Sequence, residues 1–99
     1  MVHHIVMWRF KQEVKEEERK YRMEEMELHL KGLVGTVPGL LTVDFISNPI
    51  SSSTHDMALV TTLETEEDIA KYAVHPAHVK VADTYVRPFV CDRVCLDYK

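Results

Sequence analysis

The segment VHHIVMWRF, residues 2–10, alternates between two sets of side chains, and both sets are largely apolar. His4, Val6 and Trp8 share one face of an extended chain, and Ile5 and Met7 share the other. Alternation of this length is typical of a β-strand, and apolar residues on both faces indicate a strand that is covered on both sides. The segment therefore predicts a sheet with helices on one face and a further layer on the other.

The rest of the chain supplies the helices and the remaining strands. Residues 14–34 are rich in good helix formers, and Pro38-Gly39 prevents the helix from continuing. Its apolar arc consists of Met23, Met26, Leu30, Leu33 and Val34. The other predicted elements are strands at 40–46, 55–63 and 89–98, a helix from Thr65 to Tyr72 or Val74, and a helix from Pro76 to about Val86.

The order β-α-β-β-α-β predicts one domain, residues 1–99, with a ferredoxin-like α+β fold and a four-stranded antiparallel sheet. In this topology the first and last strands are neighbours, and both helices cover one face. The other face would carry Ile5, Met7, Val94 and Leu96, which is a large apolar patch for a monomer. We therefore expect a homodimer in which the two sheets face each other and form a barrel.

Composition excludes several classes of protein. The formal charge of −4 disfavours a nucleic-acid partner, which requires a basic face. No apolar run approaches the roughly 20 residues that span a membrane, and no signal peptide is evident, so we expect a cytoplasmic protein without a membrane partner. Cys91 and Cys95 would lie about 13 Å apart in a strand, which is too far for a disulfide.

Five segments resemble the stress-responsive A/B barrel (Dabb) family over nearly the whole chain. They are VHHIVMWRFK (2–11), VPG (37–39), DMALV (56–60), YAVHPAHV (72–79) and LDY (96–98). The resemblance implies a dimeric α/β barrel and no cofactor. One relative, the plant olivetolic acid cyclase, folds a linear polyketide by acid-base chemistry between its sheet and helices. Its functional tyrosine and two histidines match Tyr72, His78 and His4. Related barrel families include cofactor-independent monooxygenases of aromatic polyketides.

Four residues are candidates for catalysis: His4, Tyr72, His78 and Asp97. Antiparallel pairing of the first and last strands would bring Asp97 beside His4, and a carboxylate in that position fixes the tautomer of an imidazole. The same pair could equally be structural. The break at Pro76 would let both Tyr72 and His78 point inward, with the tyrosine hydroxyl as a hydrogen-bond donor. The alternative is a structural role, in which the Tyr72 ring packs in the core and its hydroxyl contacts water.

The expected ligand is small and apolar or aromatic. Its predicted binding residues are Val6, Trp8, Met23, Met26, Leu30, Met57, Arg93 and Cys95. Arg93 departs from a purely apolar lining and suits an acid or an anionic ligand. The spacing of His75 and His78 allows a metal, but no complete metal motif accompanies them, so we expect none.

Two functions remain open from the sequence. The first is a small-molecule binder or cofactor-free acid-base enzyme, such as a cyclase, a lyase or a monooxygenase, acting on a carbonyl or polyketide-like compound. The second is a non-catalytic stress-response or interaction protein whose homodimer is the functional unit. An open pocket reached by His4, Tyr72 and His78 would favour the first.

Overall fold

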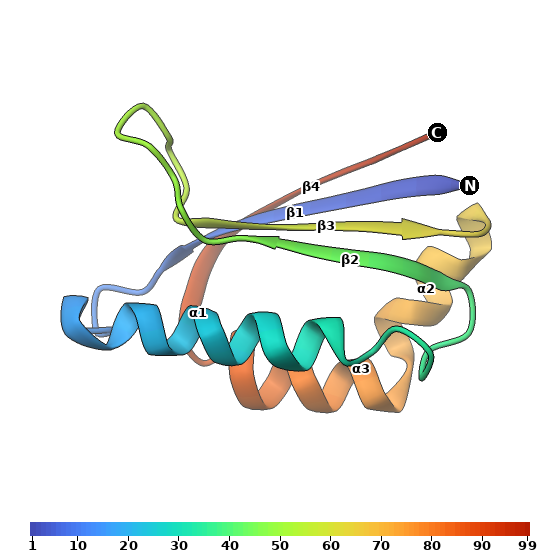
Figure 1. The fold of residues 1–99 in the computed structure, drawn as a ribbon, viewed down its shortest axis with the longest axis horizontal. Helices are drawn as coiled ribbons and strands as arrows, with labels where there is room; N and C mark the ends of the chain where they lie inside the picture. The colour runs from blue at the N-terminus through green and yellow to red at the C-terminus, as the bar shows by residue number, and fades with distance from the viewer.

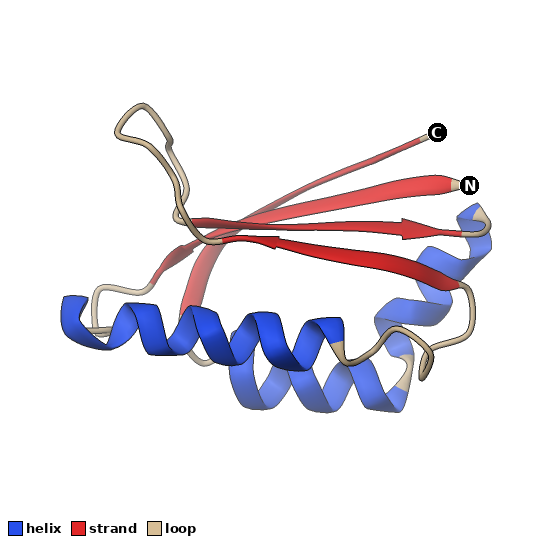
Figure 2. Cartoon of the chain, in the orientation of Figure 1, coloured by secondary structure: helices blue, strands red, loops and turns tan.

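Four strands form one antiparallel sheet, and the helices lie on one of its faces (Figure 1, Figure 2). The structure is a computed structural model that describes residues 1–99. Its elements are β1 (Val2–Phe10), α1 (Glu16–Lys31), β2 (Leu40–Ile46), β3 (Met57–Leu63), α2 (Glu66–Val74), α3 (Pro76–Val81), η1 (Ala82–Val86) and β4 (Val90–Tyr98). None of the helices combines the length and the apolar character that crossing a bilayer requires.

The strand order is β2-β3-β1-β4, which makes β1 and β4 antiparallel neighbours. This is the ferredoxin-like arrangement that the order of elements predicts. His4 lies directly opposite Asp97, and Ile5 lies opposite Leu96. The predicted register is therefore confirmed at the end of the sheet where the two termini meet (Figure 1).

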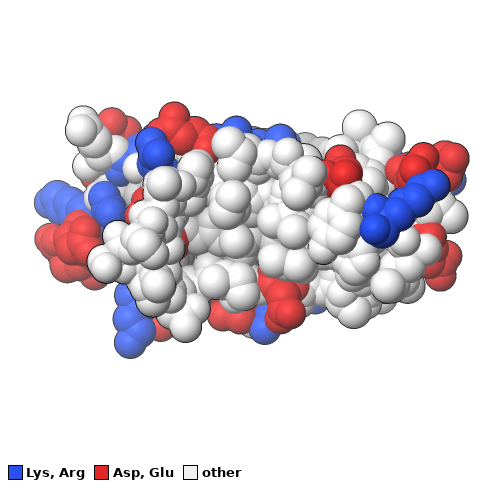
Figure 3. All heavy atoms as spheres, turned by 90° about the horizontal axis from the view of Figure 1, so that it is seen from above, with Lys and Arg blue, Asp and Glu red and all other residues white.

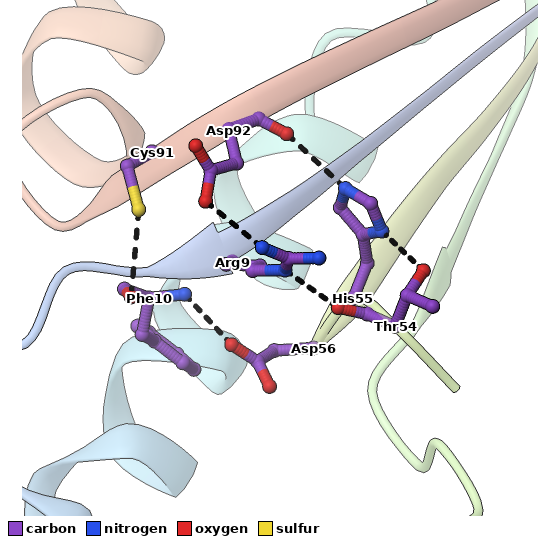
Figure 4. A network of polar contacts seen from close by, with 7 residues as sticks. All are labelled: Arg9, Phe10, Thr54, His55, Asp56, Cys91 and Asp92. Carbon is purple, nitrogen blue, oxygen red and sulfur yellow. Dashed lines mark hydrogen bonds and ion pairs between the residues drawn. The ribbon is translucent and has the colours of Figure 1, made fainter. Parts of the chain in front are cut away.

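The register of β1 and β4 shifts between Met7 and Arg9. Asp92, with a φ of 53°, lies in this bulge, where Asp92 and Arg93 together stand opposite Trp8, and Trp8 has no paired residue in β4. A polar network fixes the bulge (Figure 4). Arg9 Nη1 donates to Asp92 Oδ2 at 3.2 Å, and Arg9 Nε donates to the carbonyl of Thr54 at 2.6 Å.

The loop between β2 and β3 leaves the sheet on the side away from the helices (Figure 1). His55 and Asp56, which alternation assigns to the third strand, belong instead to the network around this loop. Asp56 Oδ2 accepts from the Phe10 amide at 2.8 Å, and His55 Nδ1 lies 2.8 Å from Thr54 Oγ1. These contacts explain why β3 begins only at Met57.

The first helix is shorter than the predicted 14–34 because its last turn tightens. The amides of Leu33 and Val34 donate only three residues back, to Leu30 and Lys31. Leu33 still joins the core, whereas Val34 is 42% exposed and leaves the predicted apolar arc. At the other end the Val14 side chain is buried but precedes the helix.

The core fills the space between the sheet and the helices. Its fully buried side chains include Met26 and Leu30 of α1, Val6 of β1, Leu63 of β3 and Tyr72 of α2. The alternation of β1 confirms the predicted face, because Val2, His4, Val6, Trp8 and Phe10 are all buried. Burial of this apolar layer is the main force that holds the helices on the sheet.

The opposite face of the sheet is apolar and is not covered by this chain. Met7 is 38% exposed, Val94 is 42% exposed and Leu96 is 61% exposed, whereas Ile5 is half-buried. Seen from this side, the middle of the molecule carries almost no charge, and lysine, arginine and carboxylate side chains gather around it (Figure 3). Exposed side chains of this size on one face match the patch that the sequence predicts.

Candidate active site

A pocket of about 730 Å³ lies between the helices and the β1–β4 half of the sheet. Side chains from β1 and β4 form one wall, and α2, α3 and η1 form the other. The last helical turn, η1, is a π-turn in which the Arg87 amide donates to the carbonyl of Ala82 at 2.8 Å. Such wide turns are frequent at functional sites, and here Ala82 and Val86 of the turn face the pocket.

Nine of the twelve predicted site residues line this pocket. They are His4, Val6, Trp8, Leu30, Tyr72, His78, Arg93, Cys95 and Asp97. The four predicted catalytic residues thus face one space, although they come from β1, α2, α3 and β4.

The three predicted methionines lie elsewhere. Met26 and Met57 are buried in the core between α1 and the sheet, and Met23 packs against the same core. The pocket lies nearer to the other helices, so the apolar stripe of α1 reaches it only through Leu30. These methionines stabilise the fold and do not line the pocket.

His4 and Asp97 form a pair across β1 and β4, in which the His4 ring is buried and the Asp97 side chain is 42% exposed. His4 Nδ1 hydrogen-bonds to Asp97 Oδ1, and Thr61 Oγ1 donates to the His4 carbonyl at 2.9 Å from the neighbouring strand. In the neutral ring this contact keeps the proton on Nδ1 and leaves Nε2 unprotonated. Partial burial acts to raise the pKa of Asp97, but the hydrogen bonds from His4 and Cys95, with the positive charges of Arg93 and of a protonated His4, together lower that pKa. Asp97 is therefore a carboxylate at neutral pH and holds the ring in place.

Tyr72 is the buried polar group of the pocket. Its side chain is 2% exposed, and its hydroxyl has no hydrogen-bond partner in the protein. Burial raises the pKa of Tyr72 to about 12, so the hydroxyl keeps its proton and acts as a donor. Its ring centre lies 4.2 Å from that of His78 and 6.3 Å from that of His4. The Tyr72 ring thus packs against both imidazoles, and its hydroxyl has no partner.

His78 follows the break between α2 and α3. Its Nδ1 lies 3.2 Å from the Ala73 carbonyl, which fixes the proton there and leaves Nε2 free. Burial lowers the pKa of His78, although the Ala73 contact opposes this, and the ring is neutral at pH 7. His75 caps α3, because its Nδ1 accepts from the Ala77 amide at 3.1 Å. That contact engages one of the two ring nitrogens of His75.

A different group of residues has the donors of a metal site. Nδ1 of His4, Sγ of Cys95 and a carboxylate oxygen of Asp97 lie within 4.8 Å of one another. These are donor types that zinc uses in proteins. Here, however, the thiol donates to Asp97 Oδ1 at 3.5 Å. Burial is the largest cause that raises the pKa of Cys95, and the hydrogen bond and negative charge of Asp97 raise it further. A cation would have to displace the proton of the Cys95 thiol and break the His4–Asp97 hydrogen bond. The three side chains therefore fit a hydrogen-bonded triad better than a metal site.

Several lining residues are missed by the sequence analysis. Ile69 and Ala73 of α2 line the pocket beside Tyr72, and helical spacing of three residues from Tyr72 could have identified Ile69. Arg87, Glu66 and Lys99 border the pocket as well. Nothing in their sequence context marks them, because their positions depend on how α2, η1 and the end of β4 meet.

Comparison with known proteins places this geometry in a family. The model of the Stress Responsive A/B Barrel Domain matches residues 2–99. No curated protein sequence matches the chain.

Solved structures share the fold. A dimeric protein of unknown function with a ferredoxin-like fold, from Bacteroides fragilis, is 24% identical with a TM-score of 0.89, and the match covers 99% of this chain and 94% of that one. A protein of Arabidopsis thaliana, At3g17210, is 24% identical with a TM-score of 0.79, covering 100% and 94%. The hydroxynitrile lyase from Passiflora edulis is 17% identical with a TM-score of 0.75, covering 98% and 90%. With its family model matched over residues 2–99, the chain belongs to the stress responsive A/B barrel domain family.

Proposed function

We propose that this protein binds a small carbonyl compound and catalyses proton transfer at the carbon next to the carbonyl, without a cofactor. The observation that carries the proposal is the buried Tyr72 hydroxyl, which has no protein partner and belongs to a ring packed against two histidines. A buried polar group without a partner is costly, and it is retained where a ligand satisfies it.

The chemistry follows from the protonation of the three side chains. The Tyr72 hydroxyl donates a hydrogen bond to the carbonyl oxygen of the substrate. His78 Nε2, which is unprotonated, removes the α-proton, and the C–H electron pair becomes the enolate. The Tyr72 hydrogen bond strengthens as negative charge develops on the oxygen. His78 then returns its proton to the enolate, or to a second position in a cyclisation or a lyase reaction.

His4 has a second place in this scheme. Asp97 fixes its ring and stabilises a positive charge on it, so His4 is the alternative base and a relay for the proton. Its ring lies edge-on to Tyr72 with centres 6.3 Å apart. The two histidines therefore contact the Tyr72 ring from β1 and from α3.

The rest of the pocket suits an apolar or aromatic body. Val6, Trp8 and Leu30 supply apolar walls, and a volume of about 730 Å³ is in the range of small-molecule sites. A lyase with the same fold, from Passiflora edulis, shows that this architecture is compatible with an enzyme.

We also propose that the chain is a homodimer through the open face of its sheet. The similar structure from Bacteroides fragilis is dimeric, and the exposed Met7, Val94 and Leu96 give this chain an apolar face of its own. The same face supports the second candidate function, a non-catalytic protein whose dimer is the working unit. Dimerisation leaves the pocket untouched, because the two lie on opposite faces of the sheet.

Deuterium exchange separates the two functions. Phenylacetone has methylene protons between a ring and a carbonyl, and their loss in D₂O is followed by proton NMR. We expect the wild-type protein to accelerate this exchange, and His78→Ala and Tyr72→Phe to remove the acceleration. His29→Ala changes a histidine of α1 outside the pocket and serves as the control. Equal rates with the wild-type protein, His78→Ala and buffer would reject the catalytic proposal in favour of the non-catalytic one.

A further inference from the structure

We infer that the natural ligand of this pocket is a carboxylate, and that Arg93 binds its anionic group at the mouth. The inference rests on the proposed function in that the same ligand presents its carbonyl to Tyr72. It adds the substrate class, an apolar or aromatic keto acid, and a residue that determines specificity.

Arg93 differs from the other arginines in having no ion-pair partner. The other four pair with carboxylates, as Arg9–Asp92, Arg19–Glu16, Arg22–Glu18 and Arg87–Asp83. A guanidinium offers five donors in a planar fork that matches a carboxylate. Arg93, which lines the pocket, is thus the one arginine of the five that forms no ion pair with a protein carboxylate.

The acidic groups of the pocket are already engaged. Asp97 hydrogen-bonds to His4, and Glu66 pairs with Lys99 at 3.0 Å. The lining contains two more cations, Arg87 and Lys99, which pair with Asp83 and Glu66. Arg93 is therefore the cation of the lining that has no carboxylate as its ion-pair partner.

The charge of Arg93 is directed across the pocket. Alternation along β4 places Arg93, Cys95 and Asp97 on the helix-facing side of the strand. The positive charge of Arg93 is among the causes that lower the pKa of Asp97 and of His78, which lie on β4 and α3. A guanidinium that acts on residues of both walls reaches a ligand held between them.

The position along the strand sets the shape of the ligand. Arg93 and Asp97 are four residues apart, which is about 13 Å along an extended strand. Tyr72 and His4 lie at the Asp97 end, because His4 pairs with Asp97. The carboxylate and the reactive carbonyl of a ligand would thus sit towards different ends of one pocket, with the apolar walls of Val6 and Trp8 between them.

Binding of two size-matched probes tests the inference without any turnover. 3-Phenylpropanoate and 3-phenylpropanamide differ only in charge and are titrated by isothermal calorimetry. We expect the acid to bind about tenfold more tightly than the amide, the range for one charge-assisted contact. Arg93→Gln should remove the difference, and Arg93→Lys should restore part of it. Lys20→Gln removes one exposed charge of α1 and should leave the difference unchanged.

Three results would overturn the inference. One is equal affinity of the wild-type protein for the acid and the amide. The other is competition by inorganic phosphate as strong as that of 3-phenylpropanoate, which would show an anion site without an apolar component. A preference for the acid that Lys20→Gln removes as fully as Arg93→Gln would likewise show a general charge effect.

The outcome is separable from that of the proposed function. 5-Oxo-6-phenylhexanoate has a carboxylate three methylene groups away from its ketone, and 5-oxo-6-phenylhexanamide is its neutral counterpart, so the exchange rates of their benzylic protons compare anionic and neutral substrates. If neither ketone exchanges while the acid preference persists, the catalytic proposal fails and the carboxylate site stands. If the amide exchanges as readily as the acid and the acid preference is absent, the catalytic proposal stands and the carboxylate site fails.

Discussion

Replacing Tyr72 by phenylalanine should make the protein more stable while removing its proposed activity. The hydroxyl is buried in a side chain that is 2% exposed, and no protein group bonds to it. Folding therefore removes the hydroxyl from water without giving it a partner. The aromatic ring remains in the variant, so its packing against His4 and His78 is retained.

The size of the gain follows from the cost of an unpaired buried polar group. That cost is about 1–3 kcal/mol, and phenylalanine avoids it without creating a cavity. We expect an increase of about 1 kcal/mol in the free energy of unfolding, at the lower end because the pocket is open on one side. For a domain of this length the gain corresponds to a rise in Tm of about 4–8 °C.

Thermal unfolding of the wild-type protein and of Tyr72→Phe, at one protomer concentration, measures the gain. Tyr21→Phe removes a tyrosine hydroxyl from an exposed position of α1 and should change Tm by less than about 2 °C. The exchange of phenylacetone in the same samples measures the loss of function. A Tm that falls in Tyr72→Phe would mean that the hydroxyl has a structural partner. Exchange that continues at the wild-type rate would mean that it does not stabilise the enolate.

Three further predictions concern the titration, the open face and the thiols. The exchange rate of phenylacetone should rise with pH through an apparent pKa below 6.5, because burial lowers the pKa of His78 and only its neutral ring accepts a proton. The rate should not fall again below about pH 9, since the Tyr72 hydroxyl, with a pKa of about 12, keeps its proton there. The dimer interface should exceed about 1,200 Å², and Met7→Glu should convert the dimer into a less stable monomer at micromolar concentration. Sedimentation velocity measures this, and a wild-type protein that sediments as a monomer would refute the dimer. Cys91 and Cys95 are free thiols and should both react with iodoacetamide in denaturant without reductant, which intact mass records as two added groups.

The sequence predicts the fold well because β1 combines alternation with apolar residues on both faces. That pattern determines which side of β1 meets the helices, and the order of elements makes β4 its neighbour. The pairing of His4 with Asp97 follows from those two facts together with one assumption about register. The ends of α1 are less predictable, because its composition continues past Lys31 while the backbone hydrogen bonds do not.

The lining of the pocket is harder to predict than the convergence of the four candidate catalytic residues on one space. An apolar stripe tells which face of α1 is buried, but not whether a given residue meets the sheet or a cavity. Met26 meets the sheet and Leu30 reaches the pocket, although both belong to the same stripe. Arg87 faces the pocket from a π-turn, and no residue pattern in the segment specifies that wide turn.

The register of β1 and β4 ties the candidate site to the proposed dimer. Side chains of a strand alternate with a period of two, so a shift of one residue would move His4 to the open face and Ile5 to the helices. The bulge at Asp92 absorbs a one-residue shift beyond Met7 and leaves the His4–Asp97 half in register. The polar network around Arg9 holds that bulge on the open face. Residues on the open face of the sheet therefore help to keep His4 facing Tyr72 and the apolar face available to a second copy.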